Sequence, residues 1–329
     1  MDHVRQIAQA VLYEGYLLWP YRESSLKNQH RWTIGGVHPE AYGSAHDNHP
    51  WRMRTECLVE AEPGDTVDVC VRFLHAVTRD VVRVRDGAEE RVAELVAGGE
   101  RRLPGQEAQE RETHASGLVL DDLCRAPAVT DIAFPAGESR EPVGERAGAV
   151  LHRWQALRGR IETGARRLEP GLFLLTVEVV NTTPWPGGTR DDAVQRTLVS
   201  AHTVLHAPHA RFVSLMDPPD ALRAYAAECD NVGAWPVLVG EEGDRHTVLS
   251  APIILYDHPR ISPESPGDLF DATEIDQLLT LSVLALSDRE RADARDGDPR
   301  AREILDRCTA LSADELMRLH GIMRKEPQG

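Results

Sequence analysis

Residues 67–73 read VDVCVRF, a strict alternation of apolar and polar side chains. Successive side chains of a β-strand point to opposite faces, so this pattern predicts a half-buried strand. Its odd-numbered residues would face a core, and Asp68, Cys70 and Arg72 would lie on the other side. A Pro-Gly-Asp turn at residues 63–65 precedes the strand, as is typical of a strand start.

Further segments have strand patterns, namely residues 82–85, 155–162, 173–180, 212–216, 235–240 and 248–256. The first of them runs into Asp86-Gly87, a pair that is typical of tight hairpin turns because glycine accepts a positive φ. A Glu-Pro-Gly turn at 169–171 separates two of the others, and a Glu-Pro-Gly also stands at 62–64. The shared turn suggests an internal duplication of a β-sandwich unit, although two unrelated hairpins would show the same feature.

The remaining segments are predicted to be helices or loops. Val4, Ile7 and Val11 fall at helical spacing, and residues 191–206 are predicted to be a second helix. Residues 98–148 are rich in Glu, Arg, Gly and Pro, which favours long loops with one short strand near 131–134. From Asp271 onward, four helix-start patterns begin at residues 271, 287, 298 and 312.

The fold class expected from these patterns is α+β, predominantly β-sandwich-like, possibly internally duplicated, with short helices and a helical C-terminal appendage. Four regions are expected: an aromatic N-terminal segment at 1–55, a first β region at 56–148, a second β or α+β region at 149–260, and a helical region at 261–329.

Composition excludes several classes of function. The chain has 53 acidic and 37 basic residues and a formal charge of −16, which disfavours nucleic-acid binding. Residues 1–10 lack the apolar run of a signal peptide, and no stretch approaches the length of a membrane span. The five cysteines are far apart and include no CxxC pair, as is typical of reduced thiols in a cytoplasmic protein.

Aromatic residues are concentrated at the start of the chain, where seven of the seventeen fall within the first 51 positions. Tyr and Trp bury area while Arg, Lys and Asn orient polar groups, so this mixture suits an interaction surface or a small-molecule site. The alternative is a segment fastened to the sandwich by aromatic anchors. The candidate binding residues are Tyr13, Tyr16, Trp19, Tyr21, Arg22, Lys27, Asn28, Arg31 and Trp32.

Two candidate chemical sites come from histidine and cysteine. On the predicted helix 191–206, His202 and His206, together with His209, would share one face and could chelate a transition metal. The alternative is that they are helix-end histidines without a ligand. Cys57 could be a nucleophile beside a histidine, but a cysteine at the start of a sandwich strand is more often part of the core.

Two other clusters of polar residues are not predicted to form a functional site. His30, His38, His46 and His49 match no metal-ligand spacing and are expected to be loop histidines. Residues 262–276 hold five carboxylates that could bind a hard cation, but acidic residues also stabilise a helix N-terminus. No Walker loop, dinucleotide fingerprint, zincin motif or nucleophile elbow occurs in the chain, which leaves an enzymatic role uncertain and less favoured.

Three stretches resemble one protein family: residues 12–22 with 25–28 and 31–32, residues 263–276, and residues 298–307. The family consists of uncharacterised proteins encoded in bacterial, mainly actinobacterial, NiFe-hydrogenase gene clusters. The resemblance spans most of the chain, but it transfers no catalytic residue and no cofactor. It implies a non-catalytic accessory or assembly role, with a hydrogenase subunit or maturation factor as the protein partner. The sequence leaves the oligomeric state open.

Overall fold

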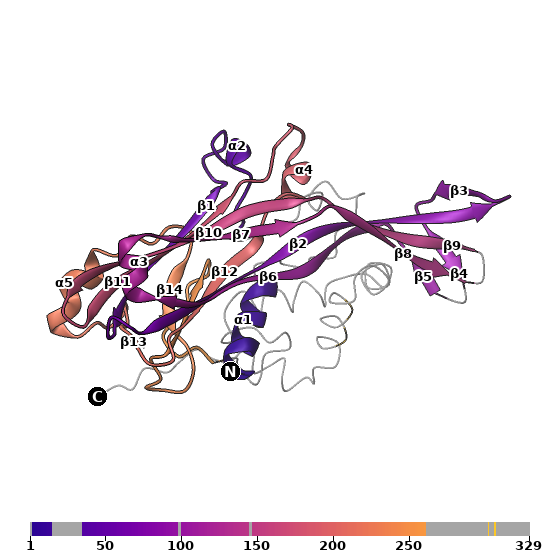
Figure 1. Cartoon of the computed structure of the whole chain (residues 1–329). Helices are drawn as coiled ribbons and strands as arrows, with labels where there is room; N and C mark the ends of the chain where they lie inside the picture. Colours follow the sequence, from indigo (N-terminus) through magenta and orange to yellow (C-terminus); the bar gives the residue numbers. More distant parts are fainter. Residues whose placement is uncertain are drawn as a thin grey trace, which may run out of the picture.

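The computed structural model describes residues 2–14, 35–97, 100–144 and 147–260, together with Arg302 and Asp306. Within these residues the fold is a β-rich α+β fold built from antiparallel sheets, as predicted (Figure 1). The predicted C-terminal helical region at 261–329, apart from Arg302 and Asp306, and residues 15–34 of the aromatic segment lie outside the described residues. No helix in the described ranges is long and apolar enough to cross a membrane.

The first sheet has five strands in the order β13-β1-β11-β10-β7. Their bounds are β13 Arg211–Phe212, β1 Arg52–Glu60, β11 Leu172–Asn181, β10 Leu157–Glu169 and β7 Ala128–Phe134. The second sheet has eight strands, with the path β14-β15-β12-β2-β9-β8, and β3 and β6 pair with β2 off this path. Their bounds are β14 Trp235–Leu238, β15 Thr247–Ala251, β12 Val199–His206, β2 Thr66–Arg85, β9 Gly148–Trp154, β8 Gly137–Val143, β3 Ala88–Arg91 and β6 Gly105–Val119. A small hairpin joins β4 Leu95–Ala97 to β5 Glu100–Arg102.

The two sheets pack face to face around one main core, which makes a β-sandwich. The prediction for residues 67–73 is confirmed, because Val69 and Phe73 of β2 are buried against Cys57 of β1 and Phe173 of β11. Thr55 of β1 also donates a hydrogen bond of 2.7 Å to Ser250 of β15, which links the two sheets through their buried faces.

Strand β2 is twenty residues long and continues beyond the sandwich into a projecting arm (Figure 1). Its far end pairs with β3 and β9, and the predicted hairpin turn at Asp86-Gly87 is confirmed, with positive φ at both residues. The arm has a small core of its own, made of Val81, Leu95, Val143 and Val150.

The prediction of long loops at 98–148 is wrong, because this segment contains β5, β6, β7, β8 and the helix α3 Leu120–Arg125. The short strand predicted near 131–134 is confirmed as part of β7. Strand β6 has the sequence GQEAQERETHASGLV, in which nearly every side chain is at least partly exposed. An edge strand that lies mostly in solvent needs no apolar alternation, and charged residues protect such an edge from pairing with other chains. The sequence therefore carried no strand signal here.

The predicted helix at 191–206 is also wrong over most of its length. A capping box between Thr189 and Asp192 does start a helix, but α4 spans only Arg190–Val194. The chain then enters β12, which pairs with β2 and β15. Residues 199–206 bury most of their side chains between these strands, so tertiary pairing decides their conformation.

Helices cover the outer faces of the sandwich. The predicted N-terminal helix is confirmed as α1 Asp2–Glu14, and Ile7 and Val11 pack on Val237 and Leu249 of the eight-stranded sheet. The 3₁₀ helix η1 Asp220–Leu222 and helix α5 Arg223–Ala227 lie over the five-stranded sheet, near Leu174.

The two Glu-Pro-Gly turns join non-equivalent strands. The turn at 62–64 connects β1 and β2, which lie in different sheets, whereas the turn at 169–171 closes the β10–β11 hairpin. Strands from the predicted regions 56–148 and 149–260 also lie side by side in both sheets. The duplication hypothesis therefore gains no support from the shared turn.

Candidate metal centre and histidine cluster

The aromatic surface predicted at the start of the chain lies almost wholly outside the described residues. Tyr13 belongs to α1, but its side chain is not among those described, and the same holds for the whole of Tyr16, Trp19, Tyr21, Arg22, Lys27, Asn28, Arg31 and Trp32. The predicted interaction surface stays a prediction.

The structure does not bring His202, His206 and His209 together. His202 and His206 lie on a strand, where residues four apart are about 13 Å apart, so the shared helical face that the metal site required does not exist. His202 is fully buried beside α1, and burial lowers its pKa to about 3. His206 contacts the hydroxyl of Thr247 at 3.1 Å, and His209 is exposed beyond the end of β12.

Cys57 lies in the main core with 1% of its surface exposed. Burial raises the pKa of its thiol well above the ordinary range, so the thiol stays protonated. This burial favours the alternative interpretation, in which Cys57 is a core residue, over the nucleophile.

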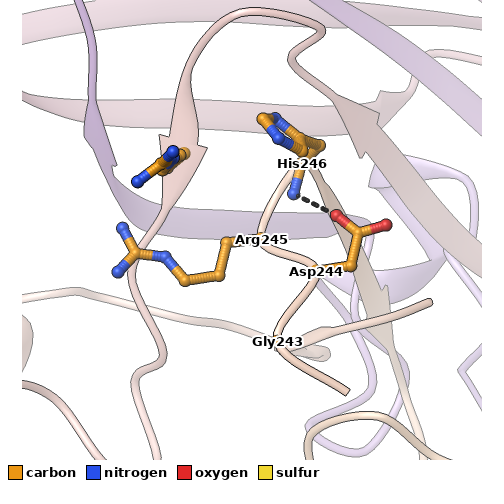
Figure 2. Close-up of a pocket in the computed structure, with 5 residues that line it drawn as sticks. Gly243, Asp244, Arg245 and His246 are labelled. Atoms are coloured by element: carbon orange, nitrogen blue, oxygen red, sulfur yellow. Dashed lines mark hydrogen bonds between the residues drawn. The ribbon is translucent and has the colours of Figure 1, made fainter. Parts of the chain in front are cut away.

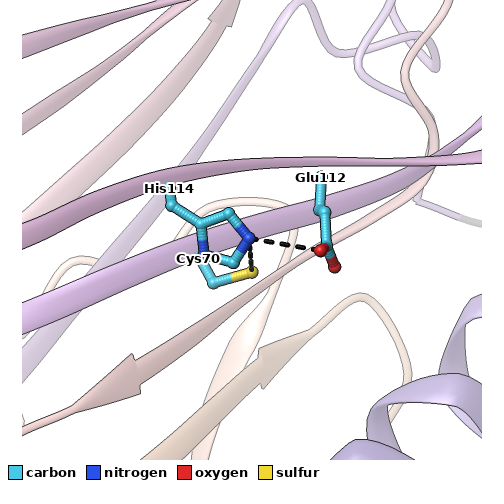
Figure 3. A group of neighbouring side chains, drawn as sticks. All are labelled: Cys70, Glu112 and His114. Atoms are coloured by element: carbon cyan, nitrogen blue, oxygen red, sulfur yellow. Dashed lines mark hydrogen bonds and ion pairs between the residues drawn. The ribbon is translucent and has the colours of Figure 1, made fainter.

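A group that the sequence did not suggest lies on the outward face of β2 and β6 (Figure 3). Cys70 is paired with His114 in the antiparallel register, and Glu112 stands two residues earlier on the same face of β6. The Sγ atom of Cys70 lies 3.9 Å from Nε2 of His114, which lies 3.3 Å from Oε1 of Glu112. One ligand atom from each residue falls within 4.8 Å of the other two. Pairing of the two strands thus assembles a thiol, an imidazole and a carboxylate.

The surroundings of Cys70 keep its thiol protonated in the absence of a cation. Its pKa is raised to about 11, mainly by burial and to a smaller extent by the negative charge of Glu112, while Arg72 and Arg5 act in the opposite direction. Arg72 is itself buried and lies 3.7 Å from Oε2 of Glu112, so that carboxylate is held between Arg72 and His114. A bound cation would add the positive charge that favours the thiolate.

The geometry of this group suits metal binding better than nucleophilic catalysis. In a cysteine–histidine–acid triad, the two imidazole nitrogens contact the cysteine and the acid separately. Here the same Nε2 atom of His114 faces both Cys70 and Glu112 (Figure 3). The side chains of His114 and Glu112 are 55% and 45% exposed, which leaves the centre accessible from solvent.

A second cluster consists of His38, Tyr42, His46, His49 and Trp185, which we term the histidine cluster. Tyr42 lies in the short helix α2 Glu40–Gly43, and its ring stacks on His46 at 4.3 Å between centroids and meets Trp185 edge-on at 5.3 Å. Nε2 of His38 lies 3.2 Å from Nδ1 of His49. Three of the predicted loop histidines, His38, His46 and His49, do lie in loops and are packed together, whereas His30 lies outside the described residues.

Burial sets the protonation of the innermost histidine in this cluster. It lowers the pKa of His38 to about 3, with smaller contributions from His49 and from the positive charge of Arg190. The pKa of His49 is lowered by burial and by the same arginine. Both imidazoles are therefore kept neutral at physiological pH.

A depression of about 350 Å³ is lined by Arg211, Gly243, Asp244, Arg245 and His246 (Figure 2). Asp244 accepts the backbone N–H of His246 at 2.9 Å, and the guanidinium of Arg245 is paired with Glu60. Nδ1 of His246 is 2.8 Å from the carbonyl of Ala210. These contacts hold the turn against β13. The depression has little net charge to attract a ligand.

Comparison of the chain with protein-family models gives no match, and comparison with curated proteins gives none either. The function is therefore inferred from the geometry of the described residues and from the resemblance of residues 12–22, 263–276 and 298–307. Of these three stretches, the structure describes only residues 12–14, Arg302 and Asp306.

Proposed function

We propose that this protein binds a transition-metal ion through Cys70, Glu112 and His114 and acts as a non-catalytic accessory or assembly protein of a metalloenzyme. The observation that carries the proposal is the convergence of three different ligand atoms within 4.8 Å of one another on paired strands. Two of the three side chains are about half exposed, so an ion could enter and leave without unfolding of the sheet.

The donor set selects the class of ion. A cysteine sulfur, an imidazole nitrogen and one carboxylate oxygen suit zinc, cobalt or nickel, whereas magnesium and calcium prefer oxygen ligands alone. Three protein ligands leave at least one coordination position open to water or to a ligand from another molecule. An accessible, incompletely coordinated ion is suited to exchange with a partner.

The accessory role comes from the resemblance to proteins of NiFe-hydrogenase gene clusters. It implies contacts with a hydrogenase subunit or a maturation factor, and the aromatic residues between Tyr13 and Trp32 are the proposed contact surface. Tyr and Trp are enriched in protein interfaces, which supports this assignment. The earlier alternative, a metal site or enzyme that uses His202 and His206 or Cys57, is disfavoured by their separation and burial.

Metal binding is tested by equilibrium dialysis of the purified chain against zinc, cobalt and nickel, followed by elemental analysis. We expect that Cys70→Ser removes one bound ion per chain. The matched control is Cys124→Ser, which alters an exposed cysteine in α3 and should leave binding unchanged. Equal metal content in the two variants and the parent chain would contradict the proposed site.

The accessory role is tested separately in cells. Affinity capture of the full chain should co-purify a hydrogenase subunit or maturation factor, and substitution of Trp19 and Trp32 by alanine should weaken that capture. Deletion of the gene should lower hydrogenase activity. Wild-type hydrogenase activity in the deletion strain would remove the accessory role while leaving metal binding intact.

A further inference from the structure

The histidine cluster contains a directed chain of hydrogen bonds that fixes where His49 carries its hydrogen. Thr197 has one hydroxyl hydrogen, and it donates this hydrogen to the carbonyl of Ala193 at 2.8 Å. The hydroxyl oxygen, 2.9 Å from Nδ1 of His38, must therefore accept a hydrogen from that nitrogen. A neutral imidazole has a single N–H, so Nε2 of His38 is an acceptor and takes the Nδ1 hydrogen of His49, 3.2 Å away. Neutral His49 is left with a bare Nε2.

His46 is held in the same form by a different partner. Its Nδ1 lies 2.8 Å from the carbonyl oxygen of Tyr42, and a carbonyl can only accept, so Nδ1 carries the hydrogen. The ring is also stacked on that of Tyr42, with an interplanar angle of 22°, which fixes its orientation. Both His46 and His49 thus have an Nε2 lone pair that no group among the described residues uses, and His46 is exposed to solvent.

This arrangement is the one in which histidine binds metals in proteins. A metal-ligating histidine normally donates its other N–H to a carbonyl, a carboxylate or a water, which fixes the tautomer and orients the ring. Zinc–nitrogen bonds are about 2.0–2.1 Å long, so two imidazoles that share an ion have centroids about 5–6 Å apart. The centroids of His46 and His49 are 6.0 Å apart. This separation lies at the upper end of that range, so the two rings can share an ion in their observed orientations.

We propose that His46 and His49 form a second metal site, which binds one zinc, nickel or copper(II) ion through their Nε2 atoms, with water completing the coordination. The site has imidazole ligands only, so it differs in chemistry from the sulfur-containing centre at Cys70 and does not depend on it. With two protein ligands the ion exchanges readily, which suits capture of a divalent ion from solution.

The first test is zinc stoichiometry by equilibrium dialysis in a Cys70→Ser background, where the other centre is disabled. We expect one zinc ion per chain to remain, and His46→Ala or His49→Ala to abolish its binding or weaken it at least about 10-fold. The control is His209→Ala, which alters an exposed histidine outside the cluster and should have no effect. His46 is exposed, so its removal leaves the core intact.

The outcomes separate this inference from the proposed function. If His46→Ala binds as much zinc as the Cys70→Ser parent, the second site is refuted whatever happens at Cys70. If Cys70→Ser binds as much zinc as the unmodified chain while His46→Ala reduces binding, the proposed function fails and the second site stands.

The second test concerns the tautomer chain. In Thr197→Val the group that accepts the Nδ1 hydrogen of His38 is lost, so His38 can carry its hydrogen on Nε2 instead. That hydrogen would then point at the Nδ1 hydrogen of His49. His49 would then move its hydrogen to Nε2 and lose the ligand atom. We expect zinc affinity to fall about 10-fold or more, and imidazole ¹⁵N spectra to show the change of tautomer at His49. A folded Thr197→Val protein with unchanged zinc affinity and an unchanged His49 spectrum would overturn the assignment.

Discussion

The two faces of β2 differ in burial and in chemistry. On the inner face, Val67, Val71 and Phe73 have no exposed surface and belong to the main core. On the outer face, Cys70 and Arg72 meet the ionisable side chains of β6. The inner face of β2 therefore contributes to the stability of the fold, and the outer face holds a proposed metal ligand. Substitutions on the inner face should change the free energy of unfolding, and substitutions on the outer face should change metal binding.

The largest effect on stability is expected on the inner face. Phe73 is fully buried and meets Phe134 edge-on at 5.7 Å, so Phe73→Ala leaves a cavity in the main core. We expect the free energy of unfolding to fall by about 3–5 kcal/mol. Urea unfolding followed by circular dichroism measures this, and a loss below about 1 kcal/mol would show that the core is not organised around this strand.

Buried histidines on both sides of the eight-stranded sheet should make the fold acid-sensitive. Burial lowers the pKa of His202 to about 3 and that of His75 to about 4, so both stay neutral in the folded chain. The unfolded chain binds these protons below about pH 6.5, and stability is therefore lost as the pH falls from 6.5 toward 4, by about 2 kcal/mol per histidine at pH 5.

Urea unfolding at pH 7 and pH 5 measures this loss, and His202→Met is the matched variant. It should flatten the pH dependence by about 2 kcal/mol over this interval, because one of the buried protonation sites is removed. Identical pH dependence in the variant and the parent chain would mean that His202 is not held neutral by the fold.

A smaller effect is expected where the two sheets are joined by the hydrogen bond from Thr55 to Ser250. Thr55→Val keeps the volume but leaves the buried Ser250 hydroxyl without this partner, at a cost of about 1–3 kcal/mol. The double variant Thr55→Val with Ser250→Ala should recover part of that loss. A double-mutant cycle measures the coupling, and no coupling would mean that the two hydroxyls do not interact.

The smallest effect on stability is expected on the outer face. Cys70→Ser alters a partly buried side chain outside the core clusters and should change the metal-free unfolding free energy by less than about 0.5 kcal/mol. Thermal unfolding of the metal-free variant tests this. A loss comparable to that of Phe73→Ala would mean that the outer face also holds the sheet together.

Much of the fold could be predicted from local sequence, because the signals were local. Three of these signals involve only residues that are close in the sequence. They are the alternation at 67–73, the Asp86-Gly87 turn and the helical spacing of Val4, Ile7 and Val11. Strand β6 could not be predicted, because an exposed edge strand is not selected for apolar residues. Strand β12 was missed because a helix start at Thr189 is followed within a few residues by pairing with distant strands.

The candidate sites depend on contacts that sequence reasoning could not supply. The alternation placed Cys70 on the polar side of its strand, which was the one available signal. Its partners His114 and Glu112 lie in a segment without a strand pattern, so their register against β2 could not be predicted from the sequence. The histidine cluster depends on the fold of a loop and on Thr197, which is distant in the sequence.

The proposed metal centre requires that Cys70 supplies a ligand to the ion. Titration of the metal-free chain with cobalt(II), followed by absorption in the near ultraviolet, tests this directly because thiolate–cobalt coordination gives a charge-transfer band. We predict a band that saturates at one ion per chain, is absent in Cys70→Ser and is retained in Cys124→Ser. A band that is absent from the parent chain, or that persists in Cys70→Ser, would contradict the proposed centre.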